Sequence, residues 1–227
     1  MEYKFWMRDI TRTLNSRICK IIFFAEGEAE AHFLESWLSS LMPVPEGVAI
    51  HCFGGINKLP SSLKLITTLP SFQTVLSVGI MIDSDTDPFA RQQSINAILR
   101  NFELIGANDN AVGQTAVFAG RKIAVHMAPD TEKQGQIEDL VLEEIRHSNE
   151  HMESWTREVA RISQAHSEFS INPKSLVQSY LGFRKPGLCG TGRGFESQIF
   201  DASSEAYRGI HSLFLPILQI EGQSSLA

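Results

Sequence analysis

The sequence has only 3 cysteines among its 227 residues, and none of them stands in a CxxC pair. An odd count without such pairs gives neither a disulfide framework nor a zinc ribbon. No stretch approaches the ~18 consecutive apolar residues of a membrane-spanning helix, and the charged residues 1–17 do not have the pattern of a secretory signal peptide. We therefore expect a cytoplasmic protein that has no membrane partner.

An excess of basic residues is also missing. The chain has 20 Lys and Arg against 26 Asp and Glu, a formal net charge of −6, which argues against a protein that coats nucleic acid by charge alone. The acidic surplus lies within residues 1–150, because residues 151–227 contain 7 basic and 7 acidic side chains. One segment, residues 169–195, contains no acid and four basic residues, namely Lys174, Arg184, Lys185 and Arg193.

Strand and helix patterns alternate through residues 20–146. Short apolar runs predict strands at 20–25, 48–53, 75–82 and 122–128, and helical spacing of apolar residues predicts helices at 28–41, 60–69, 90–104 and 137–146. Turn residues between 108 and 120 indicate a small hairpin before the last strand. Near-continuous apolar strands that alternate with helices are typical of a parallel sheet covered on both faces.

The remainder of the chain has mostly helical patterns. Helices are expected at 152–164, 173–181 and 205–219, the last interrupted at Pro216, and the glycine-rich residues 190–194 are expected to form a loop. We therefore predict two parts: an α/β domain at residues 1–148, and a helical C-terminal extension at residues 149–227 that packs on it.

Acidic residues follow the predicted strands. Glu26 ends the first strand, Asp83 ends the third, and Asp130 lies just past the fourth. Ligands of parallel α/β sheets bind outside the carboxyl ends of the strands, so we expect these acids to meet there. Asp85 would face the same way as Asp83 if the extended geometry continued. A group of like charges needs protons or cations, and oxygen donors suit Mg²⁺ or Mn²⁺.

Two of these acidic features have structural alternatives. The run from Asp83 to Pro88 is equally well explained as a polar turn and helix N-cap. Glu30 belongs to the stripe that includes Leu34 and Trp37, and a carboxylate at the top of a buried stripe needs a partner. The alternative for Glu30 is an acid favoured by the dipole at the start of a helix.

The motifs Glu26-Gly27 with Glu30, and Asp83-x-Asp85, resemble the TOPRIM domain of topoisomerases, primases and nucleases. Residues 25–30 (AEGEAE) and 122–140, where Pro-Asp precedes Gly-x-x-Glu-Asp-Leu, look more like the small stand-alone TOPRIM-like proteins related to the overcoming-lysogenisation-defect (OLD) nucleases. The resemblance covers about residues 20–144. It implies a TOPRIM-like, Rossmann-like parallel sheet of about four strands flanked by helices.

The resemblance also implies divalent-metal-dependent phosphodiester chemistry on nucleic acid. Carried over by position, the ligands of Mg²⁺ or Mn²⁺ would be Glu26, Glu30, Asp83, Asp85 and Glu138, with Asp87 and Asp139 as outer-shell groups. Glu26 and Lys174 would act in catalysis, the lysine by neutralising charge on the phosphate. The alternative for Lys174 is an exposed lysine near a helix start. The further phosphate contacts would be Arg184, Lys185 and Arg193.

Nucleic acid is the expected partner, bound weakly without metal. The resemblance also implies a separate ATPase as a protein partner, because many OLD nucleases carry an ATPase module and this chain has no P-loop GxxxxGK[ST]. Two other functions stay open. One is a non-catalytic TOPRIM-like metal-binding or interaction module in a DNA-processing or phage-defence assembly. The other is a nucleotide-sugar transferase, because an apolar strand that runs into DxD also describes the metal motif of those enzymes.

Overall fold

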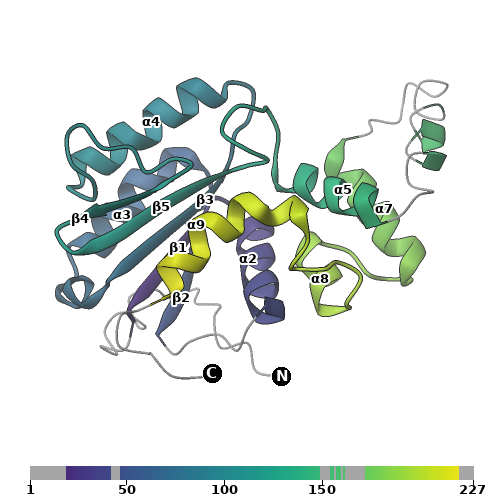
Figure 1. Ribbon diagram of the computed structural model, residues 1–227, viewed down its shortest axis with the longest axis horizontal. Helices are drawn as coiled ribbons and strands as arrows, with labels where there is room; N and C mark the ends of the chain where they lie inside the picture. The colour runs from purple at the N-terminus through teal and green to yellow at the C-terminus, as the bar shows by residue number, and fades with distance from the viewer. Residues whose placement is uncertain are drawn as a thin grey trace.

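A five-stranded sheet forms the centre of the protein in the computed structural model, which describes residues 19–41, 47–148, 154–155, 157–159, 161 and 172–219. The strands are β1 (Ile21–Ala25), β2 (Val48–Cys52), β3 (Ser77–Asp83), β4 (Thr115–Phe118) and β5 (Arg121–Ala128). Their order is β2-β1-β3-β5-β4, and only β4 runs antiparallel to its neighbour. The expected mostly parallel, Rossmann-like α/β sheet is therefore present (Figure 1).

The sheet has one strand more than the four that the sequence indicates. β4 is short and half-exposed, so it lacks the apolar run that marks the other strands. The hairpin expected within residues 108–120 has other bounds: β4 pairs with β5, the last strand itself, and so joins the sheet. The turn between them consists of Ala119 and Gly120, both with positive φ (49° and 76°), as hairpin turns that match the strand twist require.

Helices cover both faces of the sheet. They are α2 (Glu28–Leu41), α3 (Leu59–Thr67), α4 (Pro88–Asn101), α5 (Ile137–Ser148), α7 (Pro173–Arg184), α8 (Thr191–Glu196) and α9 (Arg208–Leu218), with short 3-10 turns η1 (Ile56–Lys58), η2 (Pro70–Thr74) and η3 (Glu205–Tyr207). The expectation of a loop at residues 190–194 is wrong, because Thr191 begins α8. The helix expected at 152–164 lies mostly outside the described residues, and those described within it are helical.

Side chains of the strands alternate between two hydrophobic clusters. On one face, Phe23 packs with residues of α2 and α9; on the other, Phe24 packs with residues of α3 and α4. We refer to these faces as the α9 side and the α4 side. The same alternation directs the ends of the strands: Ala25 and Met81 face the α9 side, whereas Ile82 faces the α4 side.

The C-terminal helices complete the core on the α9 side. α9 crosses the sheet over β5 and β3 (Figure 1), and the ring of Phe214 meets the ring of Phe23 edge-on at 5.1 Å between centroids. α8 packs against α2, where the indole N–H of Trp37 donates to the carbonyl of Ala202 at 3.1 Å. Within the described part of the chain, no helix combines the length and apolar character that crossing a bilayer requires.

Candidate functional site

The carboxyl ends of β1 and β3 form the topological switch point of the sheet. The chain passes from β1 to β2 on one side and then to β3 on the other, and open α/β sheets bind ligands where the strand order reverses in this way. Glu26 immediately follows β1, and Asp83 ends β3. The backbone N–H of Asp83 donates to Oε2 of Glu26 at 3.3 Å, so the structure brings these two residues together.

Asp83 lies within electrostatic reach of three other carboxylates, those of Glu30, Glu26 and Glu138. Its Oδ1 accepts a hydrogen bond from the backbone N–H of Ile137, at the start of α5, at 3.0 Å. Burial raises the pKa of Asp83 to about 8, and the negative charges of Glu30, Glu26 and Glu138 add to the rise. Without a cation, this group of acids therefore retains a proton near neutral pH.

Glu30 is buried in the first turn of α2. Its carboxylate accepts hydrogen bonds from the backbone N–H groups of Glu30 and Gly27, which is half of a capping box. A Cβ at Gly27 would lie 2.6 Å from Oε2 of Glu30, so a side chain at this position would displace the Glu30 carboxylate. Burial nevertheless raises the pKa of Glu30, and Glu138 raises it further. Glu30 thus caps its helix and also belongs to the acidic group.

Glu138 approaches the acidic group from α5. It is buried, and the hydroxyl of Thr191 on α8 donates to its Oε1 at 3.5 Å. Burial raises the pKa of Glu138, whereas the ammonium group of Lys174 opposes this rise for both Glu138 and Glu30. Lys174 is exposed in the first turn of α7. Two helices of the C-terminal segment therefore contribute side chains beside the acids.

Asp85 has different surroundings from Asp83. The strand ends at Asp83, and Asp85 adopts a φ of 53° in a two-way backbone bridge with Gly135. The extended geometry therefore does not continue, and the condition under which the two acids would face the same way is not met. The side chain of Asp85 is 60% exposed and forms an ion pair with Arg91.

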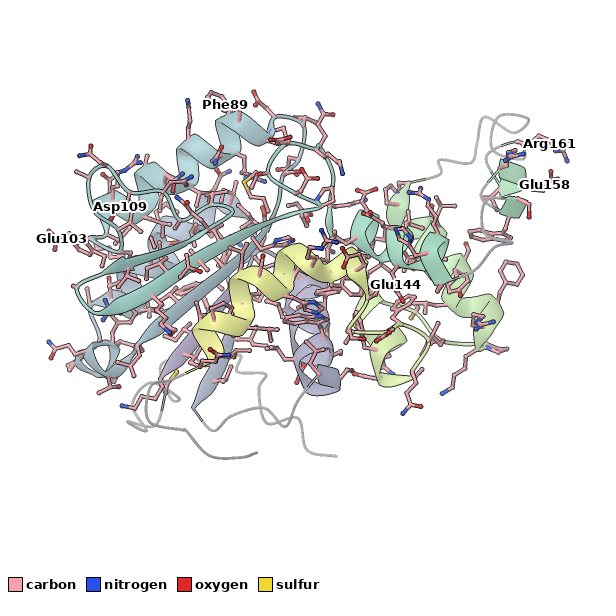
Figure 2. The ribbon with its side chains drawn as sticks, viewed as in Figure 1. Phe89, Glu103, Asp109, Glu144, Glu158 and Arg161 are labelled. Atoms are coloured by element: carbon pink, nitrogen blue, oxygen red, sulfur yellow. The ribbon has the colours of Figure 1, made fainter. Side chains whose placement is uncertain are left out.

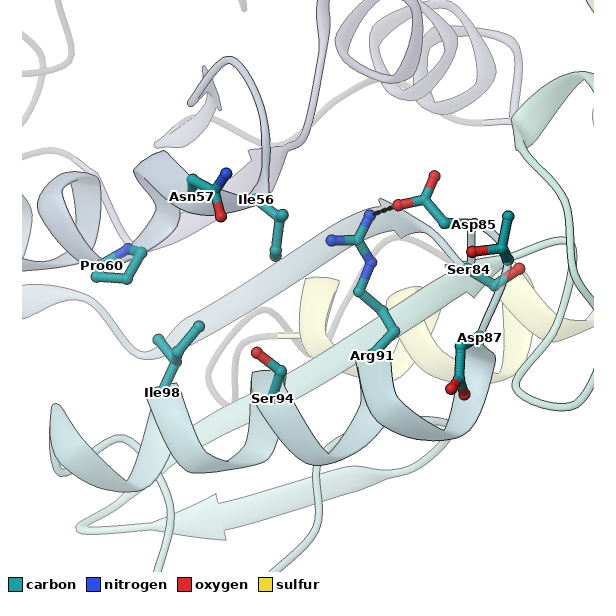
Figure 3. A pocket seen from close by; sticks show the side chains of 10 residues that line it. Ile56, Asn57, Pro60, Ser84, Asp85, Asp87, Arg91, Ser94 and Ile98 are labelled. Carbon is teal, nitrogen blue, oxygen red and sulfur yellow. Dashed lines mark hydrogen bonds and ion pairs between the residues drawn. The ribbon is translucent and has the colours of Figure 1, made fainter.

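Arg91 of α4 joins three parts of the switch point, and Figure 3 shows its contact with Asp85. Its Nη2 contacts the carboxylate of Asp85 and lies 3.5 Å from Oε1 of Glu26, while its Nε donates to the carbonyl of Asp83 at 3.2 Å. The side chain is only 10% exposed. Burial raises the pKa of Glu26, and the guanidinium group opposes that rise. Sequence reasoning missed Arg91, although side chains in the first turns of a helix lean back toward its start.

The remaining predicted acids accept hydrogen bonds from backbone N–H groups close to them in the sequence. Asp87 is the N-cap of α4 and accepts from the N–H of Ala90 at 2.9 Å, as the structural alternative predicts. Oδ2 of Asp139 accepts from the N–H of Gln136 at 2.9 Å, at the start of α5. Asp130 accepts two backbone hydrogen bonds in the loop after β5. These local hydrogen bonds explain the presence of the three acids without requiring a bound ligand.

The basic residues proposed to contact phosphate lie on the surface of the C-terminal segment. Arg184 is in the last turn of α7, Lys185 follows it, and Arg193 is on α8; all three are exposed. The guanidinium group of Arg184 lies over the ring of Tyr180, 5.9 Å from its centroid.

A pocket of about 380 Å³ opens beside Arg91 on the α4 side. Ile56, Asn57 and Pro60 line one wall, and Arg91, Ser94 and Ile98 of α4 line the other (Figure 3). The loop of residues 84–87 closes one end.

A profile of the family described as "Protein of unknown function (DUF3226)" matches residues 20–216. The chain belongs to the DUF3226 family. The matched residues include all five strands, the four grouped carboxylates, Arg91 and Lys174. No curated protein and no solved structure matches the chain.

The donor groups of this DUF3226 chain suit a hard divalent cation, because every candidate ligand is a carboxylate oxygen. The raised pKa of Asp83 adds a second point of fit, since a cation would neutralise the charges that cause it. Within the described residues, no group of three or more His, Cys, Asp or Glu is arranged so that it could hold a metal ion. Of the five predicted ligands, Asp83, Glu30, Glu138 and Glu26 lie together, and Asp85 is turned to Arg91.

Proposed function

We propose that this protein is a divalent-metal-dependent enzyme of the TOPRIM and OLD-nuclease kind that hydrolyses phosphodiester bonds in nucleic acid. The observation that carries the proposal is the group of carboxylates around Asp83 at the switch point of the sheet. Burying like charges lowers stability unless a proton or a cation neutralises them. A bound Mg²⁺ or Mn²⁺ accounts for such a group, and the motif resemblance supports the same chemistry.

The residues have distinct roles in this proposal. Asp83, Glu30 and Glu138 hold the metal, and Glu26 adjoins it from the α4 side. When bound, the metal polarises a phosphoryl oxygen and makes a water molecule more acidic. Because burial raises the pKa of Glu26, its carboxyl group is suited to exchange a proton with that water or with the leaving oxygen.

The C-terminal segment supplies positive charge in this proposal. Lys174 lies beside Glu30 and Glu138, where its ammonium group can neutralise charge that develops on the phosphate. At and just beyond the C-terminal end of α7, and on α8, the exposed side chains of Arg184, Lys185 and Arg193 contact the backbone of the nucleic acid. The metal-binding acids therefore come from residues 1–148, and the cations that contact phosphate come from residues 149–227.

One observation favours the non-catalytic alternative. Arg91 already neutralises Glu26 and Asp85, so an internal cation occupies part of the predicted metal site. A metal-binding or interaction module that keeps the fold but catalyses no reaction would need no further cation to neutralise Glu26 and Asp85. The nucleotide-sugar transferase receives no comparable support, because the two acids of its DxD motif have different partners.

Cleavage assays with single- and double-stranded DNA and RNA in Mg²⁺ or Mn²⁺ test the proposal. We expect metal-dependent cleavage by the wild type and none by the double variant Glu26→Gln/Asp83→Asn. The control is Asp109→Asn, which repeats the change of an aspartate to asparagine at a position beyond the C-terminal end of α4 (Figure 2). Equal activity of the wild type and the double variant would rule out the proposal, and metal binding without cleavage would favour the module.

A further inference from the structure

The pocket beside Arg91 contains polar side chains that are not committed elsewhere. Asn57, Thr86 and Ser94 line it, and among the described residues none of their side chains has a hydrogen-bond partner. A volume of about 380 Å³ lies within the range of small-molecule sites, which combine apolar walls with a few placed polar groups. The space therefore has the size and the free hydrogen-bonding groups of a binding site.

The charges around the pocket select the kind of ligand. Asp85 and Asp87 are the acids that line the space, and Arg91, which also contacts Glu26, is the only cation among the lining residues. Because Arg91 is already paired with Glu26 and Asp85, the surroundings keep a net negative charge. A free phosphate group would be repelled, so the ligand part that enters is uncharged.

The walls indicate the shape of this uncharged group. Ile56 and Pro60 face Ile98 across the space (Figure 3), which suits the two faces of a flat ring. The amide of Asn57 offers a donor and an acceptor, and the hydroxyl of Ser94 can do both. Such groups pair with the edges of nucleobases, which present donors and acceptors side by side.

We propose that this pocket binds the nucleobase of the nucleotide next to the bond that is hydrolysed. The inference rests on the proposed function and gives it a substrate class. Arg91 lies 3.5 Å from Glu26, and Glu26 accepts from the N–H of Asp83, so a base in the pocket directs its phosphate toward the acidic group. A base inside a duplex is stacked and paired. The substrate is therefore single-stranded or locally unpaired nucleic acid.

Calorimetric titration with single nucleosides in EDTA tests the pocket without metal or catalysis. The wild type is expected to bind at least one of adenosine, guanosine, cytidine and uridine with a Kd of about 0.1–1 mM, as ligands of this size allow. Ser94→Leu fills the pocket from an exposed position of α4 and should weaken binding at least tenfold. Gln93→Leu makes the same change at the neighbouring exposed position, outside the pocket, and should leave binding unchanged.

Asn57→Ala provides a second variant at an exposed position, and it should change the order of preference among the four nucleosides. Absence of nucleoside binding by the wild type would overturn the inference, as would equal binding by Ser94→Leu. Tighter binding of inorganic phosphate or of spermidine than of any nucleoside would overturn it as well. These outcomes differ from failure of the proposed function, because an inactive protein that binds nucleosides through Ser94 supports the pocket and rejects the hydrolysis.

Discussion

The acids on the two sides of the switch point have different electrostatic surroundings. On the α9 side, burial raises the pKa of Asp83 to about 8, and the negative charges of Glu30 and Glu138, together with that of Glu26, add to the rise. On the α4 side, Glu26 and Asp85 share the guanidinium group of Arg91. The negative charge of the first set is not compensated without a cation, whereas Arg91 compensates most of the negative charge of the second set. Nearby acids in a sequence can therefore differ in whether they are ready to bind metal.

Strand geometry explains this division. Residues of β1 and β3 point alternately to the two sides, so Ala25 and Met81 face the α9 side. Asp83, two residues after Met81, continues on that side, whereas Glu26, one residue after Ala25, is directed to the α4 side. Asp85 leaves the strand geometry altogether. The sharpest experiments compare equivalent changes on the two sides.

The largest difference is expected between Asp83→Asn and Asp85→Asn in metal binding. Asp83→Asn should lower Mn²⁺ affinity about 100-fold or more, because loss even of an outer-shell group costs 10- to 100-fold. Asp85→Asn should change the affinity by no more than about threefold, since its exposed charge is screened by water. Calorimetric titration with Mn²⁺, and the rise of Tm that saturating Mn²⁺ produces, measure both variants. Equal losses in the two variants would remove the distinction between the two sides.

Replacement of Arg91 by methionine tests whether its charge compensates the acids on the α4 side. Glu26, whose side chain is 17% exposed, would lose its cation, and we expect a loss of about 3 kcal/mol in the free energy of unfolding. Urea denaturation at pH 7 measures this loss. The control is Arg208→Met, because Arg208 pairs with Glu205 on the surface, at 76% side-chain exposure, and should change stability by less than about 0.5 kcal/mol. Similar losses in the two variants would contradict the structural role of Arg91.

A pH-dependent effect is expected from the interior of the α9 side. His126 of β5 is buried near Phe214, and its Nε2 has no hydrogen-bond partner among the described residues. Burial lowers the pKa of His126 from 6.5 to about 4. Between these two pH values the unfolded chain binds the proton that the folded protein excludes, so stability falls as the pH is lowered from about 6.5 toward 4.

His126→Leu removes this titration while keeping an apolar group of similar size. Between pH 7.5 and pH 4.5, the wild type should lose about 2 kcal/mol more of its free energy of unfolding than the variant does. Urea denaturation at the two pH values gives the comparison. Equal losses in the wild type and the variant would show that His126 does not contribute, and acid sensitivity would then have to come from other groups.

The smallest effect is expected from the exposed cation of the α9 side. Lys174→Met should reduce kcat/KM for nucleic acid cleavage about tenfold, because Lys174 lies beside Glu30 and Glu138 but is accessible to water. Lys64→Met removes an exposed lysine from α3, which covers the opposite face, and should have little effect. An equal decrease in both variants would indicate general attraction of nucleic acid rather than a role for Lys174 in the site.

Much of the fold could be predicted because it depends on local patterns. Continuous apolar runs located β1, β2, β3 and β5 to within two residues. Helical spacing predicted α2 with its observed bounds. β4 was missed as a member of the sheet because it is short and half-exposed. α8 was missed because its glycine-rich sequence has little helical preference, and its packing against α2 compensates for that.

The candidate site was only partly predictable for the same reason. The rule that acids meet at the carboxyl ends of parallel strands correctly brought Glu26 and Asp83 together. That rule does not predict that Glu26 and Asp83 have different neighbouring side chains. The assignment depends on Arg91, which contacts Glu26 across 65 residues of sequence.

By itself, the sequence determined the α/β alternation, most element bounds and the acids that follow the strands, because these depend on neighbours within a few positions. Tertiary structure alone decided which acids face one another and which face Arg91. It also placed Lys174 and Thr191, from the C-terminal helices, beside Glu30 and Glu138. The physical reason is that the protonation and metal affinity of a carboxylate depend on its surroundings in space. At this switch point, residues more than 50 positions apart supply those surroundings.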